Sequence, residues 1–280
     1  MTSLQWSYPR RAGAQAEGGR LREFLATIGR AVRGRARFTL LLAALSLGVL
    51  REMVSPLAWR RTVRTAFRRA LRQSVGGGLS TVLVTAALVG LALVNQALYW
   101  LVQAGQENLI GAVLVGGLVR GMGPVLVGLI LLGRSAMVSV SEIGTLSSGG
   151  QIRALEAMGL DAFQMLLLPR ACALALASFT LTVMFVASAL ITGFIADNLI
   201  QGSTITFWAF LDMVLRAMRL SDFLLFPVKT LLIGLLVSVA AGLTGLEARR
   251  RTAAAELLPR GFVRGVLVIL IVNLVFMLVV

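Results

Sequence analysis

Residues 171–195 read ACALALASFTLTVMFVASALITGFI, a run of 25 residues without a charged side chain. An α-helix rises about 1.5 Å per residue, so this run is long enough to cross the roughly 30 Å hydrocarbon core of a bilayer. Four more apolar stretches have sufficient length, at residues 79–102, 109–132, 223–243 and 261–280. The sequence therefore predicts an all-α membrane protein with five transmembrane helices.

The composition agrees with a membrane protein and argues against an enzyme. Of the 280 residues, 58% are hydrophobic and only 14% are charged, whereas soluble domains carry about 25% charged residues. Histidine is absent and Cys172 is the one cysteine, so the most common general base and a cysteine-based metal site are both missing. The sequence also lacks the phosphate-binding loop of nucleotide hydrolases. We expect neither catalysis nor a bound cofactor in this chain.

The positive charge is concentrated at the N-terminal end. Residues 1–72 hold 15 Arg and 3 Glu, and Trp59, Val63, Phe67 and Leu71 form an apolar stripe between the arginines. We predict a disordered basic arm over residues 1–20, interfacial amphipathic helices over residues 21–75 and the five-span domain over residues 76–280. Nucleic-acid binding is disfavoured because the basic segment leads directly into membrane-length apolar runs.

The charges of the loops predict the orientation. The loop at residues 103–107 has no Lys or Arg, whereas the loop between the fourth and fifth spans holds Arg249, Arg250 and Arg251. Because cytoplasmic loops carry an excess of Lys and Arg, the N-terminus is expected inside and the C-terminus outside.

Two cations fall inside the predicted spans. Arg120 lies near the middle of the second span and Lys229 lies in the fourth, and no acid is expected at a matching depth. A charge in the hydrocarbon region is unfavourable, so Arg120 is expected to face a substrate cavity or a partner, or else to extend toward water. Lys229 has the same two alternatives. Between these cations in the sequence, Gly121 and Pro124 should loosen the second span and form a hinge or a wall of the substrate cavity, and Gly117 with Gly121 permits close helix approach.

A short helix is predicted over residues 149–158, on the cytoplasmic side between the second and third spans. Ser148 and Gln151 fit a capping box, and Ile152, Leu155 and Met158 recur at three-residue spacing. Arg153 and Glu156 are spaced to pair on the other face. Such a helix could dock into a groove of a soluble partner, or it could be an ordinary connector.

The same region resembles a known family. The motif residues extend without gaps over about 50 positions: Gly123-Pro124-Val125, Gly133-Arg134, Glu142-Ile143-Gly144, Gln151-Ile152, Ala154-Leu155-Glu156, Met158, Asp161 and Pro169-Arg170. This pattern is similar to that of MlaE/YrbE-type permeases, and a weaker match continues through Asp222 and Lys229.

The resemblance implies the membrane subunit of an ABC transporter that moves phospholipids or similar hydrophobic molecules between the inner and outer membranes of bacteria. It implies a homodimer in the inner membrane with a cytoplasmic ATPase, which binds the ATP, a periplasmic MCE-domain protein and, in some systems, a STAS-domain protein. Arg120 and Lys229 would face the cavity, and the 149–158 helix would contact the ATPase.

The sequence departs from the family pattern at three positions. Gly121 and Gly150 stand where the family often has Glu, and Ala162 replaces the Pro that follows Asp161. A cavity ion pair for Arg120 is therefore not expected, and Arg153 and Glu156 remain as charged candidates for coupling. A stand-alone carrier or channel for a hydrophobic or anionic solute is the alternative function.

Overall fold

The computed structural model describes residues 36–53, 55, 59–106, 109–159, 161–200, 206–248 and 254–279. The expected basic arm at residues 1–20 and the cluster Arg249–Arg251 lie outside these described residues. The chain divides into two compact units, Met1–Leu45 and Ser46–Val280. A helix of residues 36–53 runs across the boundary between them, and the second unit contains everything discussed below.

All regular elements in the described part of the chain are helical. Five helical stretches are long and apolar enough to cross a membrane: Arg61–Gln103, Ile110–Ser148, Phe163–Leu199, Leu220–Leu246 and Glu256–Leu278. Each coincides with one of the five apolar runs of the sequence, so the predicted number and order of spans are confirmed.

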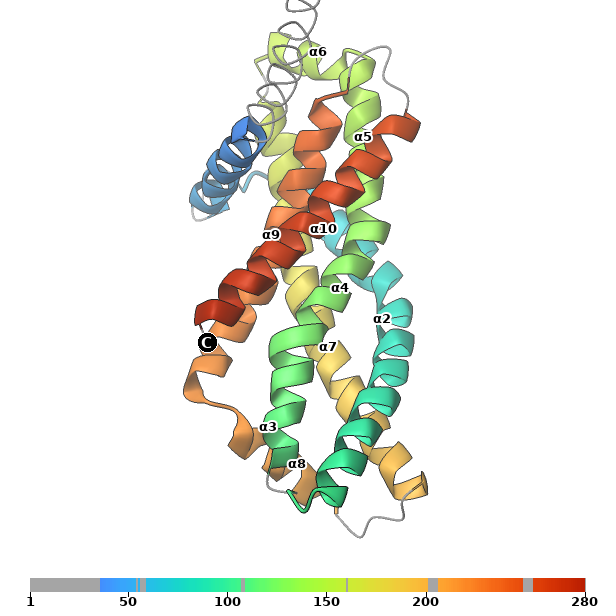
Figure 1. Cartoon of the computed structure of the whole chain (residues 1–280). Coiled ribbons are helices and arrows are strands. Elements are labelled where there is room, and N and C mark those ends of the chain that lie inside the picture. The colour runs from blue at the N-terminus through green and yellow to red at the C-terminus, as the bar shows by residue number, and fades with distance from the viewer. Residues whose placement is uncertain are drawn as a thin grey trace, which may run out of the picture. The chain divides into compact units, whose positions relative to one another are not determined.

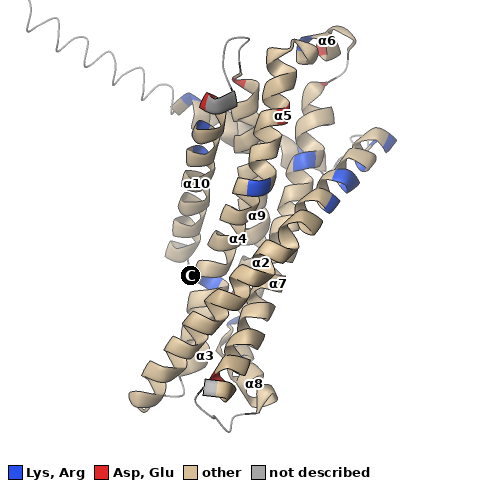
Figure 2. Cartoon of the chain, turned by 90° about the vertical axis from the view of Figure 1, so that its right-hand side faces the viewer, with Lys and Arg blue, Asp and Glu red and all other residues tan. Residues whose placement is uncertain are grey.

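Three of these stretches are much longer than a bilayer requires, and Phe163–Leu199, with 37 residues, is the shortest of the three. Helix α2 (Arg61–Gln103) has 43 residues, and the stretch Ile110–Ser148 has 39 residues, or about 58 Å of helix. The basic segment that contains Val63 and Phe67 forms the first turns of α2 rather than a separate helix, and the expected domain boundary at 75/76 falls inside α2. Figure 2 shows the basic end of α2 toward the end of the bundle that carries α6.

Two π-helical segments interrupt the α-helix of the second span. It consists of α3 (Ile110–Leu114), the π-helical segment η3 (Val115–Met122), α4 (Gly123–Leu131), a second π-helical segment η4 (Leu132–Ala136) and α5 (Met137–Ser148). Pro124 lies in the first turn of α4 and offers no N–H to the carbonyl oxygens of η3, which runs directly into α4. The expectation that Gly121 and Pro124 loosen this span is confirmed, since η3 ends next to them.

Small residues set the closest helix contact, between α2 and α7 (Leu168–Ile200). A Cβ atom on Gly90 would lie 2.1 Å from the carbonyl oxygen of Ala189, and one on Gly193 would lie 2.4 Å from Cβ of Val94. In contrast, a Cβ on Gly117 would meet only Leu93, at 3.6 Å, and one on Gly121 would meet the backbone of its own helix. Among the described residues, the close contact between helices is therefore made at Gly90 and Gly193 rather than at Gly117 and Gly121.

The packing of α8 against α3 determines where α9 begins in the bundle. Helix α8 (Phe207–Ala217) packs against α3, where a Cβ on Gly111 would lie 2.4 Å from the carbonyl oxygen of Met213. The next helix, α9 (Leu220–Leu246), therefore begins part-way along the bundle, as Figure 1 shows, and α10 (Ala254–Val279) packs beside it. The short helix α6 (Gln151–Ala157) joins α5 to the segment η5 (Phe163–Leu167), which leads into α7.

Candidate functional site

Arg120 is paired with an acid inside the bundle. Its Nη2 donates to Oδ2 of Asp222 at 2.6 Å, and the Asp222 side chain is only 2% exposed while that of Arg120 is 31% exposed. The same Oδ2 accepts the backbone N–H of Arg219 at 2.8 Å. The expectation that no acid could meet Arg120 is therefore wrong.

The predicted fourth span begins at residue 223, which would put Asp222 at a membrane surface. Asp222 is the third residue of α9, and α9 begins part-way along the bundle because α8 folds back against α3. The carboxylate consequently lies at the depth of η3 rather than outside the spans.

Lys229 lies in the same region and is buried. Its Nζ donates to the backbone oxygen of Arg120 at 2.5 Å and to Oδ1 of Asn273 in α10 at 2.6 Å. The residue is 5% exposed. Lys229 is therefore held beside Arg120 rather than extended toward the lipid headgroups, and its place at a substrate cavity stays a prediction. We call Arg120, Asp222, Lys229 and Asn273 the membrane cluster.

The membrane cluster carries an excess of positive charge. It contains two cations but only one carboxylate, and Lys229 does not bond to that carboxylate. All four side chains come from η3, α9 and α10, within candidate spans. The Nε of Arg120 is buried and forms no hydrogen bond with any described residue. A buried donor without an acceptor is unfavourable, so this arrangement suits an anionic group such as a phosphate.

No metal site accompanies the cluster. Within the described ranges, His, Cys, Asp and Glu side chains nowhere gather in a group of three. The chemistry available to the membrane cluster is therefore charge stabilisation and hydrogen bonding.

The predicted coupling helix is α6. None of its residues is buried: Gln151, Arg153 and Glu156 are exposed, Ile152 and Leu155 are half-buried, and the adjacent Met158 is 66% exposed. No ion pair joins Arg153 to Glu156, because the four ion pairs between described residues involve other side chains. The described residues therefore cover the apolar side chains of α6 only in part.

The start of α6 differs from the prediction made from the sequence. The hydroxyl of Ser148 donates to the backbone oxygen of Thr145 in α5, and the N-cap of α6 is Gly150 at φ +75°. The predicted Ser148–Gln151 capping box is therefore wrong. Gly159 follows the helix at φ +75°, a backbone conformation that glycine adopts without strain and that suits the end of a helix.

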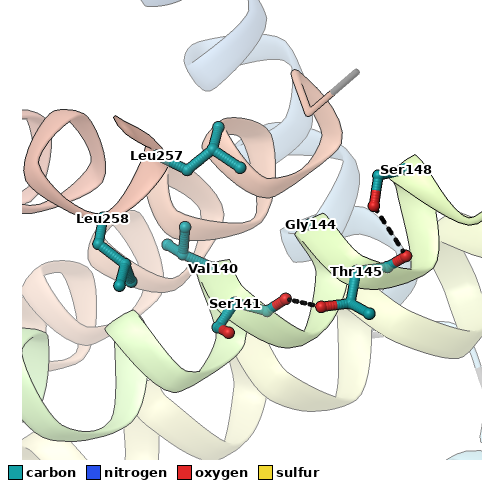
Figure 3. A pocket seen from close by; sticks show the side chains of 7 residues that line it. All are labelled: Val140, Ser141, Gly144, Thr145, Ser148, Leu257 and Leu258. Carbon is teal, nitrogen blue, oxygen red and sulfur yellow. Dashed lines mark hydrogen bonds between the residues drawn. The ribbon is translucent and has the colours of Figure 1, made fainter. Parts of the chain in front are cut away.

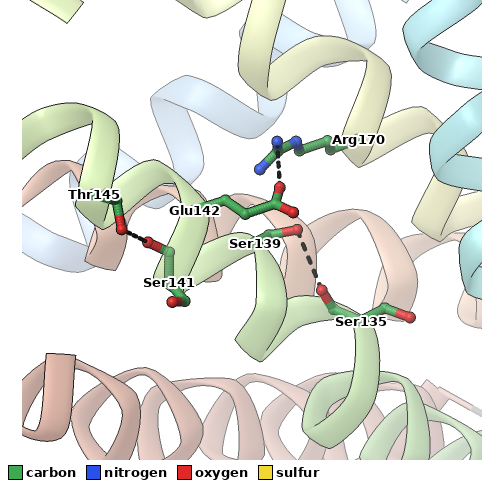
Figure 4. A network of polar contacts seen from close by, with 6 residues as sticks. All are labelled: Ser135, Ser139, Ser141, Glu142, Thr145 and Arg170. Carbon is green, nitrogen blue, oxygen red and sulfur yellow. Dashed lines mark hydrogen bonds and ion pairs between the residues drawn. The ribbon is translucent and has the colours of Figure 1, made fainter. Parts of the chain in front are cut away.

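An ion pair joins the two helices that flank α6. Nη2 of Arg170 in α7 donates to Oε2 of Glu142 in α5 at 2.6 Å, and Figure 4 shows the pair between the two helices. On the α7 side, Asp161 accepts the backbone N–H of Phe163 at 2.9 Å and so caps the start of η5.

Arg134 and Gly144, two further motif residues, lie where helices pack against each other. Nη1 of Arg134 in η4 lies 3.4 Å from the hydroxyl of Thr81, and its guanidinium covers Gly77 of α2. Gly144 in α5 is buried, and a Cβ there would lie 3.4 Å from Leu257 of α10. Gly121 is half-buried and Pro124 is buried, both at the joint between η3 and α4.

A small pocket adjoins Gly144 between α5 and α10. Hydroxyl groups line one wall and leucines the other, as Figure 3 shows; the lining residues are Val140, Ser141, Gly144, Thr145, Ser148, Leu257 and Leu258. The Thr145 hydroxyl is already engaged with the carbonyl oxygen of Ser141, one turn earlier in α5. Apart from Gly144, no predicted site residue lines the pocket, and it is distinct from the membrane cluster.

Sequence reasoning missed Asn273 and the pair formed by Arg264 and Glu247. Asn273 is an amide in an otherwise apolar helical run, and that isolation was a usable signal. Nη1 of Arg264 donates to Oε2 of Glu247 at 2.8 Å and to the hydroxyl of Thr244 at 3.2 Å. Glu247 follows directly after α9, so its contact with α10 depends on how the two helices pack.

Comparison with known proteins identifies relatives. The family model described as Permease MlaE matches residues 67–279. The chain is 27% identical over 191 residues to "Protein TRIGALACTOSYLDIACYLGLYCEROL 1, chloroplastic" from Arabidopsis thaliana, which covers 68% of this chain and 53% of that protein. It is 28% identical over 109 residues to "Intermembrane phospholipid transport system permease protein MlaE" from Haemophilus influenzae, covering 39% of this chain and 42% of the relative.

A third relative is a probable ABC transporter permease protein from Synechocystis sp., 29% identical over 170 residues, with 60% of this chain and 63% of the relative covered. The chain thus spans about half the length of the curated relatives that it matches.

Proposed function

Because the MlaE permease model matches most of its length, the chain belongs to the MlaE permease family, and we propose that it is the membrane subunit of an ABC transporter for phospholipids or similar hydrophobic molecules. The observation that carries the proposal is this match over residues 67–279. It covers all five candidate spans except for the first turns of α2. The relative from Haemophilus influenzae is named as a phospholipid transport permease, which supports a lipid as the cargo.

The membrane cluster supports a lipid with an anionic headgroup. Its surplus positive charge and the unpaired Nε of Arg120 lie within the candidate spans. An anion in a medium of low dielectric constant is stabilised strongly by such groups. In this proposal, Arg120 meets the phosphate of the lipid while Asp222 holds the guanidinium.

The proposed orientation places the N-terminus and α6 in the cytoplasm and the C-terminus on the outer side. The basic first turns of α2 support it, since Lys and Arg are retained on the cytoplasmic side. The length of the stretch Ile110–Ser148 supports it as well. At about 58 Å, this stretch exceeds the hydrocarbon core, so α5 and α6 can project from the membrane.

We further propose that a separate ATPase binds α6 and drives transport. The half-buried Ile152 and Leu155 and the exposed Met158 offer an apolar face, and Arg153 and Glu156 offer flanking charges. An amphipathic helix of this kind suits a groove on a soluble partner. Hydrolysis of ATP then belongs to the partner, and the chain itself needs no catalytic residues.

The remaining partners follow from the family. We propose a homodimer in the inner membrane of a bacterium, with an MCE-domain protein on the periplasmic side and, in some assemblies, a STAS-domain protein. The cargo then moves between the inner and outer membranes. One relative is chloroplastic, so an equivalent membrane of an organelle would provide the same setting.

The test is to purify the chain from its native membrane, identify co-purifying proteins and lipids by mass spectrometry, and reconstitute the complex in vesicles that contain fluorescent phospholipid. We expect an ATPase to co-purify and lipid movement to require ATP. Lipid movement by the chain alone, without nucleotide, would overturn the proposal in favour of a stand-alone carrier.

A further inference from the structure

One backbone carbonyl in the second span lacks its ordinary helical partner. In an α-helix the carbonyl oxygen of Arg120 would accept the N–H of residue 124, but that residue is Pro124, which has no N–H. The preceding amide is also engaged elsewhere, because Gly123 N–H donates to the carbonyl oxygen of Leu118 at the end of η3. At the joint between η3 and α4, the α-helical donor to the Arg120 oxygen is therefore missing.

A side chain from another helix satisfies this oxygen. The ammonium of Lys229 donates to it at 2.5 Å, from α9. A second bond of the same ammonium goes to Oδ1 of Asn273 in α10, at 2.6 Å. Three elements distant in sequence thus meet at one nitrogen atom, and the bonds form in a region of low dielectric constant, where each is strong.

We infer that Lys229 is a positioning residue whose ammonium replaces the amide N–H that Pro124 lacks, and that Asn273 holds this ammonium in place. Lys229 is 5% exposed and two of its three donors are engaged, whereas the side chain of Arg120 is 31% exposed. Of the two cations, Arg120 is the one that an anionic lipid can reach. Lys229 fixes the backbone from which Arg120 projects.

This division of roles leads to a suppressor experiment. In Lys229→Met, which keeps an unbranched side chain of similar length, the Arg120 oxygen loses the hydrogen bond from the ammonium, and Tm in detergent should fall by roughly 5 °C. Replacement of Pro124 by Ala restores an N–H at position 124. The double variant Pro124→Ala, Lys229→Met should therefore recover most of the lost Tm, although the two changes lie on different helices.

A matched control uses the neighbouring Thr230, which is also buried on α9. Its hydroxyl bonds only to the backbone of its own helix, at Phe226 and Pro227. The Tm loss of Thr230→Val should be unaffected by Pro124→Ala. Rescue of both single variants to the same extent, or of neither, would overturn the inference.

Asn273 provides an independent measurement. Asn273→Leu removes the acceptor and should lower Tm, whereas Asn273→Asp keeps an oxygen at that position and should not. Equal losses for the two variants would contradict the role of Asn273.

Transport is the second readout, and it rests on the proposed function. ATP-dependent lipid movement should fall at least tenfold in Lys229→Met and return to within threefold of wild type in the double variant. If the wild-type complex moves no lipid, the proposed function fails while the Tm cycle still tests the positioning role. If Tm is rescued and transport is not, Lys229 contacts the lipid directly and the inference is wrong.

Discussion

Nη2 of Arg120 lies 2.6 Å from Oδ2 of Asp222, although 102 positions separate the two residues in the sequence. The pair joins the π-helical segment of the second span to the first turn of α9. It also resolves how an arginine can lie within a span, because the carboxylate compensates most of the charge that burial would otherwise leave unpaired.

Loss of either partner should impair transport more than it impairs assembly. Asp222→Asn leaves Arg120 without its counter-ion, and Arg120→Ala removes the cation that we propose to meet the lipid. We expect at least a tenfold loss of ATP-dependent lipid movement in both, measured in reconstituted vesicles. Dimer content and ATPase binding, measured by size-exclusion chromatography, should remain. Unchanged transport in Arg120→Ala would show that this cation only extends toward water.

Replacement of Leu155 and Glu156 in α6 should uncouple ATP hydrolysis from transport. The double variant Leu155→Ala, Glu156→Ala removes an apolar contact and a charge that no described residue of this chain engages in an ion pair. Lipid movement should fall several-fold while insertion into the membrane persists. A control pair at the opposite end of the bundle, Leu199→Ala with Asp212→Ala, should leave transport intact. Wild-type transport in the α6 variant would defeat this prediction.

Exchanging the acid and the arginine of the Glu142–Arg170 ion pair between their two positions should preserve coupling of ATP hydrolysis to transport. The pair ties α5 to α7 on either side of α6, and its Arg170 side chain is 23% exposed. Glu142→Arg and Arg170→Glu each bring like charges together and should lower the lipid moved per ATP hydrolysed. The combined variant restores opposite charges and should recover much of that ratio. A swap that performs no better than the single variants would rule out a pairing role.

Gly90→Ala should destabilise the protein far more than Gly117→Ala. A methyl group on Gly90 meets the Ala189 carbonyl oxygen at 2.1 Å, so α2 and α7 must separate, at a cost of about 1–3 kcal/mol. At Gly117 the nearest atom is a flexible Leu93 carbon at 3.6 Å, and alanine is the better helix former. Thermal unfolding in detergent measures both, and similar Tm values for the two variants would contradict the packing argument.

Much of the fold could be read from local sequence. The five spans follow from apolar length alone, as with residues 171–195, because the backbone in a bilayer must satisfy its hydrogen bonds internally and a helix does so within one segment. The loosened second span was predictable for a similar reason. Gly121 and Pro124 alter the helix through their own backbone properties, whatever surrounds them.

The errors concern contacts between helices. The Gly117/Gly121 motif has the spacing of a contact site, but the rotation of the helix directs it away from a close neighbour, while Gly90 and Gly193 meet across α2 and α7. The Ser148 capping box failed because the hydroxyl found an acceptor in the preceding turn, at Thr145. Sequence spacing identifies candidates for such contacts and does not choose among them.

Sequence by itself determined the membrane class, the five spans, the short helix between the second and third, and the family motif around it. Tertiary structure alone decided which charges meet. Asp222 reaches Arg120 because α8 folds back on α3 and starts α9 at depth, and Lys229 reaches the Arg120 carbonyl because α9 and α10 pack beside the proline joint. Helix formation depends on neighbours a few positions away, whereas the partner of a buried charge depends on the depth and rotation of whole helices.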